Sequence, residues 1–148
     1  MSAVHNAAMT RRLLHAFLAL VVLCLAACAT SPSGSPSKRD LVLQNYAAAV
    51  RWGDFDEAWT FVEPTRRGDQ PLTDLERERF KQIQVTGYEI RNQTMAPDAL
   101  SLEQTVEIRL ISRATQVERV IVDHQRWTYD PLVKRWWLVS GLPDISPR

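Results

Sequence analysis

The fold is decided by the stretch Leu100-Ser-Leu-Glu-Gln-Thr-Val-Glu-Ile-Arg-Leu110, in which apolar and polar residues alternate over the length of a strand. Just before it, Pro97-Asp98 is typical of a turn, and Val85 to about Met95 predicts another strand. Further strands are expected over 116–129 and 134–142. Because the connections are short, we expect an antiparallel sheet of about four strands.

Upstream of these strands the apolar spacing is that of helices. Asp40 is predicted to cap a helix that runs to about Trp52 and stops at Gly53. Asp54 is predicted to cap a second short helix, which Pro64 blocks from continuing. These two helices would form a helical hairpin.

A third helix is predicted where Thr73 and Glu76 repeat the capping-box spacing. The chain thus places its helices first and its strands afterwards. That order predicts one α+β domain over residues 38–148, with the N-terminal helices packed on a curved antiparallel sheet.

The first 27 residues have a different character. They contain Arg11 and Arg12, no acidic residue, and an apolar run from Leu13 to Ala27 that only one histidine interrupts. A basic segment followed by an apolar run of this length is typical of an export signal, whereas a spanning helix needs about 20 apolar residues. We therefore expect 1–27 to be a signal peptide.

The end of this run, Leu25-Ala-Ala-Cys28, resembles the lipobox of bacterial lipoproteins. The resemblance implies that the Cys28 thiol carries a diacylglyceryl group and that cleavage makes Cys28 the first residue. Several acyl chains would anchor the protein stably to a membrane. By resemblance to enterobacterial lipoproteins, Ala29 after the cysteine favours the periplasmic face of the outer membrane.

A linker follows over residues 28–37, made of small, polar and proline residues. As a coil it would span about 17 Å, and fully stretched roughly 33 Å. Loss of residues 1–27 would remove two of the 18 basic residues and none of the 17 acidic ones, so the mature chain would be slightly acidic.

The domain resembles the nuclear transport factor two-like, cone-shaped superfamily. The resemblance rests on the segment from Tyr46 to Trp59, with its Gly53-Asp54 junction, and on the tryptophan-rich closing hairpin from Trp127 to Pro143. It implies helices that close one side of a curved sheet around a conical cavity. Some members use that cavity for catalysis or ligands, and others fill it.

One candidate pocket follows from the strand faces. If the hairpin after Leu110 centres on Ala114 and the last one near Leu132, then Gln104, His124 and Ser140 lie in one polar row at the end of an apolar face. His124 could carry protons or orient a ligand there. Alternatively, it is a hydrogen-bonded residue at the end of the core, and a bulge near Val120–Val122 would move it to the other face.

No convincing catalytic set accompanies this row. No carboxylate falls in it, and Asp123 is expected on the opposite face from His124. The chain has no phosphate loop and no zinc motif, so we expect no enzyme activity, cofactor or metal. The interspersed charges lack the basic stripe of a nucleic-acid binder.

Two functions stay open at this point. The first is a non-catalytic, membrane-tethered lipoprotein whose domain binds another protein of the cell envelope. The second is a binder, or less readily a converter, of a small apolar molecule in the cone.

Overall fold

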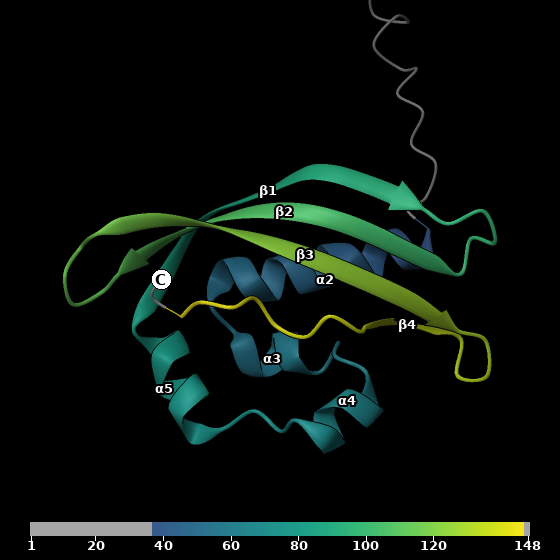
Figure 1. The fold of residues 1–148 in the computed structure, drawn as a ribbon, viewed down its shortest axis with the longest axis horizontal. Coiled ribbons are helices and arrows are strands. Elements are labelled where there is room, and N and C mark those ends of the chain that lie inside the picture. The colour runs from purple at the N-terminus through teal and green to yellow at the C-terminus, as the bar shows by residue number, and fades with distance from the viewer. Residues whose placement is uncertain (1–36, 147–148) are drawn as a thin grey trace, which may run out of the picture. The chain divides into compact units, whose positions relative to one another are not determined.

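The computed structural model describes residues 37–146, with helices followed by an antiparallel sheet (Figure 1). The helices are α2 (Lys38–Trp52), α3 (Phe55–Trp59), α4 (Pro64–Asp69) and α5 (Asp74–Lys81). The strands are β1 (Ile83–Met95), β2 (Ser101–Ser112), β3 (Glu118–Asp130) and β4 (Arg135–Leu138), in the sheet order β1-β2-β3-β4. The predicted α+β architecture is confirmed.

The predicted signal peptide, the lipid attachment at Cys28 and the linker up to residue 36 lie outside the described residues. Among the described helices, none is long and apolar enough to cross a membrane.

The cap of helix α2 lies three residues earlier than predicted. Ser37 is the cap, because its Oγ accepts from the backbone N of Asp40 at 3.2 Å and the Asp40 carboxylate accepts from Ser37 N at 3.3 Å. Asp40 is therefore the third residue of a capping box and not the cap. The predicted stop at Gly53 is confirmed, with a left-handed φ of 73°.

The shorter helices follow their local signals, with one correction. Asp54 caps α3, and Thr73 with Glu76 forms the predicted capping box of α5. Pro64 was expected to block continuation of the second helix, but that helix, α3, already ends at Trp59, and Pro64 instead begins α4, which was not predicted. A proline suits the first helical position because the N–H that it lacks has no partner there.

The core lies between α2, α3 and the inner face of the sheet. Tyr46 and Val50 of α2 are fully buried, as are Trp127 and Leu138 of the sheet. The Tyr46 ring meets the edge of Trp127, with centroids 5.1 Å apart. Large side chains thus occupy the space between helix and sheet.

The predicted register of the β2–β3 hairpin is wrong by one residue. Gln104 pairs with Gln125, and Thr105 pairs with His124. The turn closes with Gln116 in the left-handed region, at φ 57°. Glycine or asparagine usually marks such a position, so the sequence offered no sign of the extra residue.

The β3–β4 hairpin shows the same one-residue error. Trp127 pairs with Leu138 rather than with Trp137, and Lys134 closes the turn at φ 55°. The strand itself ends at Leu138, four residues before the predicted end. These two shifts decide which side chains meet inside the domain.

Candidate functional site

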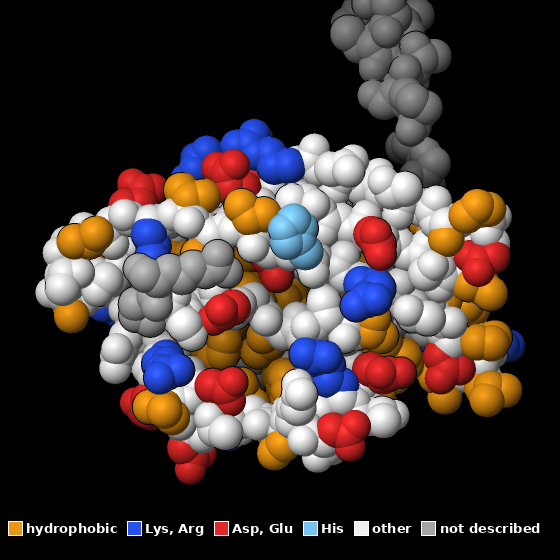
Figure 2. All heavy atoms as spheres, viewed as in Figure 1, with side chains coloured by type: hydrophobic (Ala, Val, Ile, Leu, Met, Phe, Trp, Pro, Cys, Tyr) orange, Lys and Arg blue, Asp and Glu red, His pale blue; other side chains and the backbone are white. Residues whose placement is uncertain are grey.

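The structure does not bring Gln104, His124 and Ser140 into one row. Gln104 is buried on the inner face at 3% exposure, whereas His124 is exposed on the outer face beside Thr105, 3.3 Å from its hydroxyl (Figure 2). Ser140 lies beyond β4, where its hydroxyl accepts from the backbone N of Arg126. The predicted row is corrected: the register shift turns His124 outward.

A different set of polar residues meets on the inner face, which we call the inner polar cluster: Tyr88, Gln104, Asp123 and Gln125. Gln125 is its centre. Its Nε2 donates to the Tyr88 hydroxyl at 3.0 Å and to an Asp123 carboxylate oxygen at 2.7 Å. Its Oε1 accepts from Gln104 Nε2 at 2.6 Å. The amide thus ties three strands together.

Burial changes the acid–base properties of this cluster. It raises the pKa of Asp123 from 3.8 to about 6, although the hydrogen bond from Gln125 works in the opposite direction. Burial also raises the pKa of the Tyr88 hydroxyl. A carboxyl with a pKa near 6 changes its charge when the pH moves within the physiological range.

Asp123 and Gln125 were not predicted from the sequence to belong to a polar cluster. Asp123 does lie on the opposite face from His124, as predicted, but that face is the inner one. The sequence does contain one sign of their placement. Trp127 is a large apolar residue, and the alternation of a strand puts Asp123 and Gln125 on the same face as Trp127.

The space around the cluster is densely packed. Tyr46 faces it from α2, and its hydroxyl is buried with no hydrogen-bond partner among the described residues. Phe61 and Trp127 both meet the Tyr46 ring edge-on, at 5.9 and 5.1 Å. Because aromatic side chains enclose it, we interpret the inner polar cluster as a structural part of the core.

A groove of about 910 Å³ lies between α2 and β1. We call it the α2–β1 groove, and its lining includes Leu43, Ala47, Trp52, Tyr88 and Ile90. The Trp52 side chain is 88% exposed and that of Ile90 48%. Trp52 is the strongly exposed tryptophan of the described chain.

Arg51 connects this groove to the core. Its guanidinium lies 5.7 Å from the centroid of the Tyr88 ring and donates to the Tyr88 carbonyl at 3.2 Å. The groove therefore offers an apolar wall from α2 and a cation at the edge of the sheet.

The two edges of the sheet differ. Along β4, the segment after α3 forms a parallel bridge between Val62 and Leu138, and Glu63 N donates to the Leu138 carbonyl at 3.0 Å. At the opposite edge, no other backbone segment of the described chain pairs with the outer side of β1. This edge belongs to the 13-residue strand β1, whose pairing with β2 shifts register between Val85 and Gly87 and between Ile90 and Asn92, and it borders the α2–β1 groove.

Two smaller hollows have other surroundings. One of about 550 Å³ lies between α5 and the segment 141–146, and includes Arg66, Glu76 and Arg79. The other, of about 340 Å³, lies around His124 and Arg126. Within residues 37–146, no group of histidine, cysteine and carboxylate side chains is placed to hold a metal ion.

Comparisons with known proteins show a similarity of fold and nothing more. No protein-family model matches the chain, and no curated protein matches it. Among solved structures, it is similar to a SEC-C motif containing protein from Rhodopseudomonas palustris, with a TM-score of 0.55 and 14% identity over 70% of this chain and 76% of that one. A SEC-C motif containing protein from Psychrobacter arcticus has a TM-score of 0.53 and 9% identity over 76% and 63%.

Proposed function

We propose that this protein is a lipoprotein of the bacterial cell envelope, anchored through Cys28 at the periplasmic face of the outer membrane. Its domain binds an extended segment of another envelope protein in the α2–β1 groove, without catalysis. The leader, the Leu25-Ala-Ala-Cys28 motif and the following linker support the anchor.

We further propose a nuclear transport factor two-like fold for the domain. The Gly53-Asp54 helix junction and the helices on one face of a four-stranded antiparallel sheet support this assignment. The conical interior would be of the filled kind, since Tyr46 and Trp127 pack against each other there.

The open edge of β1 carries the binding proposal. An added strand would pair with N–H and C=O groups of β1 that no other backbone segment of the described chain pairs with, although Arg51 already donates to the Tyr88 carbonyl. The side chains of the added strand would lie against the apolar wall of α2. Trp52 and Ile90 would lose their exposure to water in such a complex. The β4 edge cannot offer the same site, because residues 61–63 already cover it.

In-cell photo-crosslinking tests this binding site. A photoreactive residue at Gln93, which lines the groove, is expected to capture one discrete envelope protein from the full chain. Ala48→Arg should abolish the adduct, because it places a long charged side chain in the groove. Ala114→Arg, in the β2–β3 loop, is the matched control. An adduct that survives Ala48→Arg would refute the groove as the binding site.

Fractionation tests the anchor separately. The wild-type chain should be found in the membrane fraction with the mass of a lipidated Cys28, whereas Cys28→Ser should lose the lipid mass. An unmodified Cys28 in the wild-type protein would refute the lipoprotein proposal.

The alternative of a small apolar ligand in the cone has less support. The interior expected to hold it is occupied by fully buried Tyr46 and Trp127, and the polar row expected to orient the ligand is not formed. We therefore propose no second function.

A further inference from the structure

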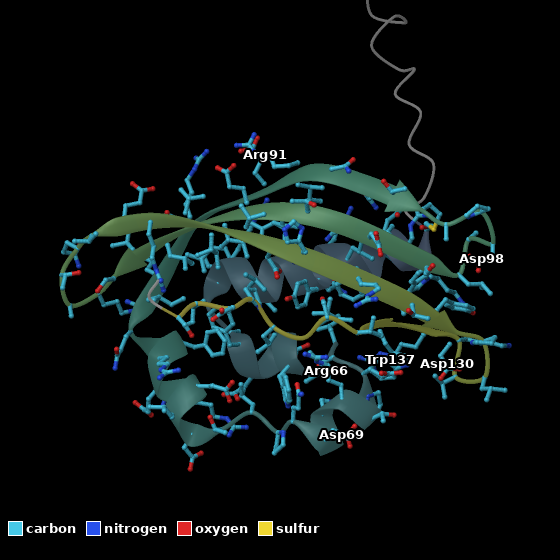
Figure 3. All side chains as sticks on the ribbon, viewed as in Figure 1. Arg66, Asp69, Arg91, Asp98, Asp130 and Trp137 are labelled. Carbon is cyan, nitrogen blue, oxygen red and sulfur yellow. The ribbon has the colours of Figure 1, made fainter. Side chains whose placement is uncertain are left out.

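The two ends of the sheet carry loops of different chemistry. The first residues of α2 lie at the same end as the β1–β2 loop (96–100) and the β3–β4 loop (131–134), as Figure 1 shows. We call this the linker end, because the chain passes from the linker into α2 there. Asp98 and Asp130 mark the two loops in Figure 3. The β2–β3 loop (113–117) lies at the opposite end.

Large apolar side chains project from the linker end. Leu132 is 91% exposed and Val133 61%, while Leu100 and Leu41 are each 43% exposed. We call these four residues the apolar tip. Figure 2 shows hydrophobic side chains gathered over this end of the molecule. Adjacent leucine and valine residues at a turn are unusual, because turns favour glycine, asparagine, aspartate and serine.

The backbone of both loops is firmly organised. Asp98 accepts from Leu100 N at 2.9 Å, and Asp130 accepts from Leu132 N at 2.8 Å. Tyr129 N donates to the Leu100 carbonyl at 2.7 Å, which ties the β1–β2 loop to the end of β3. The carboxylates thus serve the turn backbone while the apolar side chains project outward.

The loop at the opposite end provides a comparison within the same molecule. It reads Arg-Ala-Thr-Gln-Val over 113–117, and Val117 is its one large apolar residue. Its polar side chains form hydrogen bonds with the backbone of the turn. For example, Gln116 Nε2 donates to the Arg113 carbonyl at 3.0 Å. A hairpin of this sheet can therefore close with polar residues.

Basic residues accompany the apolar tip. Lys38 and Arg39 lie in the first turn of α2, where the helix dipole disfavours a positive charge. Lys134 and Arg135 follow the exposed Leu132 and Val133. Apolar side chains beside lysine and arginine suit the boundary between acyl chains and phospholipid headgroups.

We propose that the apolar tip inserts into the surface of the phospholipid bilayer that anchors the chain. This inference rests on the proposed lipid attachment at Cys28. The linker end is where the anchor reaches the domain, and a coil of residues 28–37 would span only about 17 Å. So short a tether keeps the tip at a high local concentration beside the bilayer, where even weak insertion is favoured.

Fluorescence of the full chain in vesicles tests the insertion. The probe is an environment-sensitive fluorophore on Leu132→Cys, with Val117→Cys as the matched control in the exposed opposite loop. The lipidated chains are reconstituted in vesicles of phosphatidylethanolamine and phosphatidylglycerol with a nitroxide-labelled lipid. We expect a blue-shifted emission and at least threefold stronger quenching at position 132 than at 117.

A second variant separates insertion from the preference of the dye itself. With the fluorophore on Leu100→Cys, the added substitution Leu132→Asp should reduce quenching at least twofold, whereas Val117→Asp should leave it unchanged. Circular dichroism verifies that each labelled chain is folded.

The mass of the mature chain shows whether Cys28 is acylated, and this separates a failure of the insertion from a failure of the anchor. A lipidated chain whose label at 132 is quenched no more than the label at 117 overturns the insertion and leaves the anchor standing. A mature chain with no acyl mass on Cys28 overturns the anchor, and the insertion with it.

Discussion

The two faces of β3 differ in a way that simple alternation does not predict. The inner face carries Asp123 and Gln125 before Trp127, whereas the outer face exposes Val120 and Val122. The inner polar residues are tolerated because Gln125 has partners for both ends of its amide. Polarity alone therefore does not tell which face of this strand is buried.

The largest expected effect comes from the inner face at Trp127. Trp127→Ala should lower the free energy of unfolding by about 3–5 kcal/mol, because it empties a fully buried site next to Tyr46. Urea denaturation measures the loss. Thr128→Ala, on the exposed outer face, is the control and should change stability by less than about 0.5 kcal/mol. Equal losses would contradict the assigned faces.

The second effect concerns the centre of the inner polar cluster. Gln125→Ala should cost about 2–3 kcal/mol, because it leaves Gln104 Nε2 and the Tyr88 hydroxyl buried without this partner. The same denaturation series measures it. If Gln104→Ala in the Gln125→Ala background costs as much as it does alone, the two amides do not interact.

The third effect is a pH dependence from Asp123. Its pKa of about 6 in the folded protein exceeds the ordinary 3.8, so the folded chain binds more protons between these values, and stability falls as pH rises through this window. The penalty is absent below about pH 4 and complete above about pH 6, at about 3 kcal/mol. Asp123→Asn keeps the shape and should remove the slope. Parallel stability curves for the two proteins would show that the pKa is not raised.

The smallest effect is expected at the outer face. His124→Ala should change stability by less than about 0.5 kcal/mol, because the ring is exposed and its hydrogen bond to the Thr105 hydroxyl is exposed with it. Thermal unfolding measures it. A loss near that of Gln125→Ala would return His124 to the inner face and restore the register predicted from the sequence.

The helices were the most predictable part of the chain. Gly53 ends α2 and Thr73 caps α5 through bonds that reach only a few residues along the chain, so local sequence suffices to place them. Pro64 was expected to block a helix, but it begins α4 instead, since the proline that is excluded from a helix interior suits the first helical position.

The candidate site was the least predictable part. A one-residue shift in a hairpin turns every side chain of a strand to the other face. Both decisive turns close with a left-handed residue that lacks the usual identity, Gln116 in one and Lys134 in the other. The predicted Gln104, His124 and Ser140 row failed for this reason, and Gln104 alone of the three lies buried on the inner face.

By itself, the sequence determined that helices precede strands, where α2 ends, which residues cap α3 and α5, and the expectation of a lipid anchor at Cys28. These depend on neighbours in the chain. Only the tertiary structure decided the strand register, the burial of Asp123, and which sheet edge stays open. These depend on residues far apart in sequence, such as Val62 beside Leu138, whose meeting no local pattern encodes.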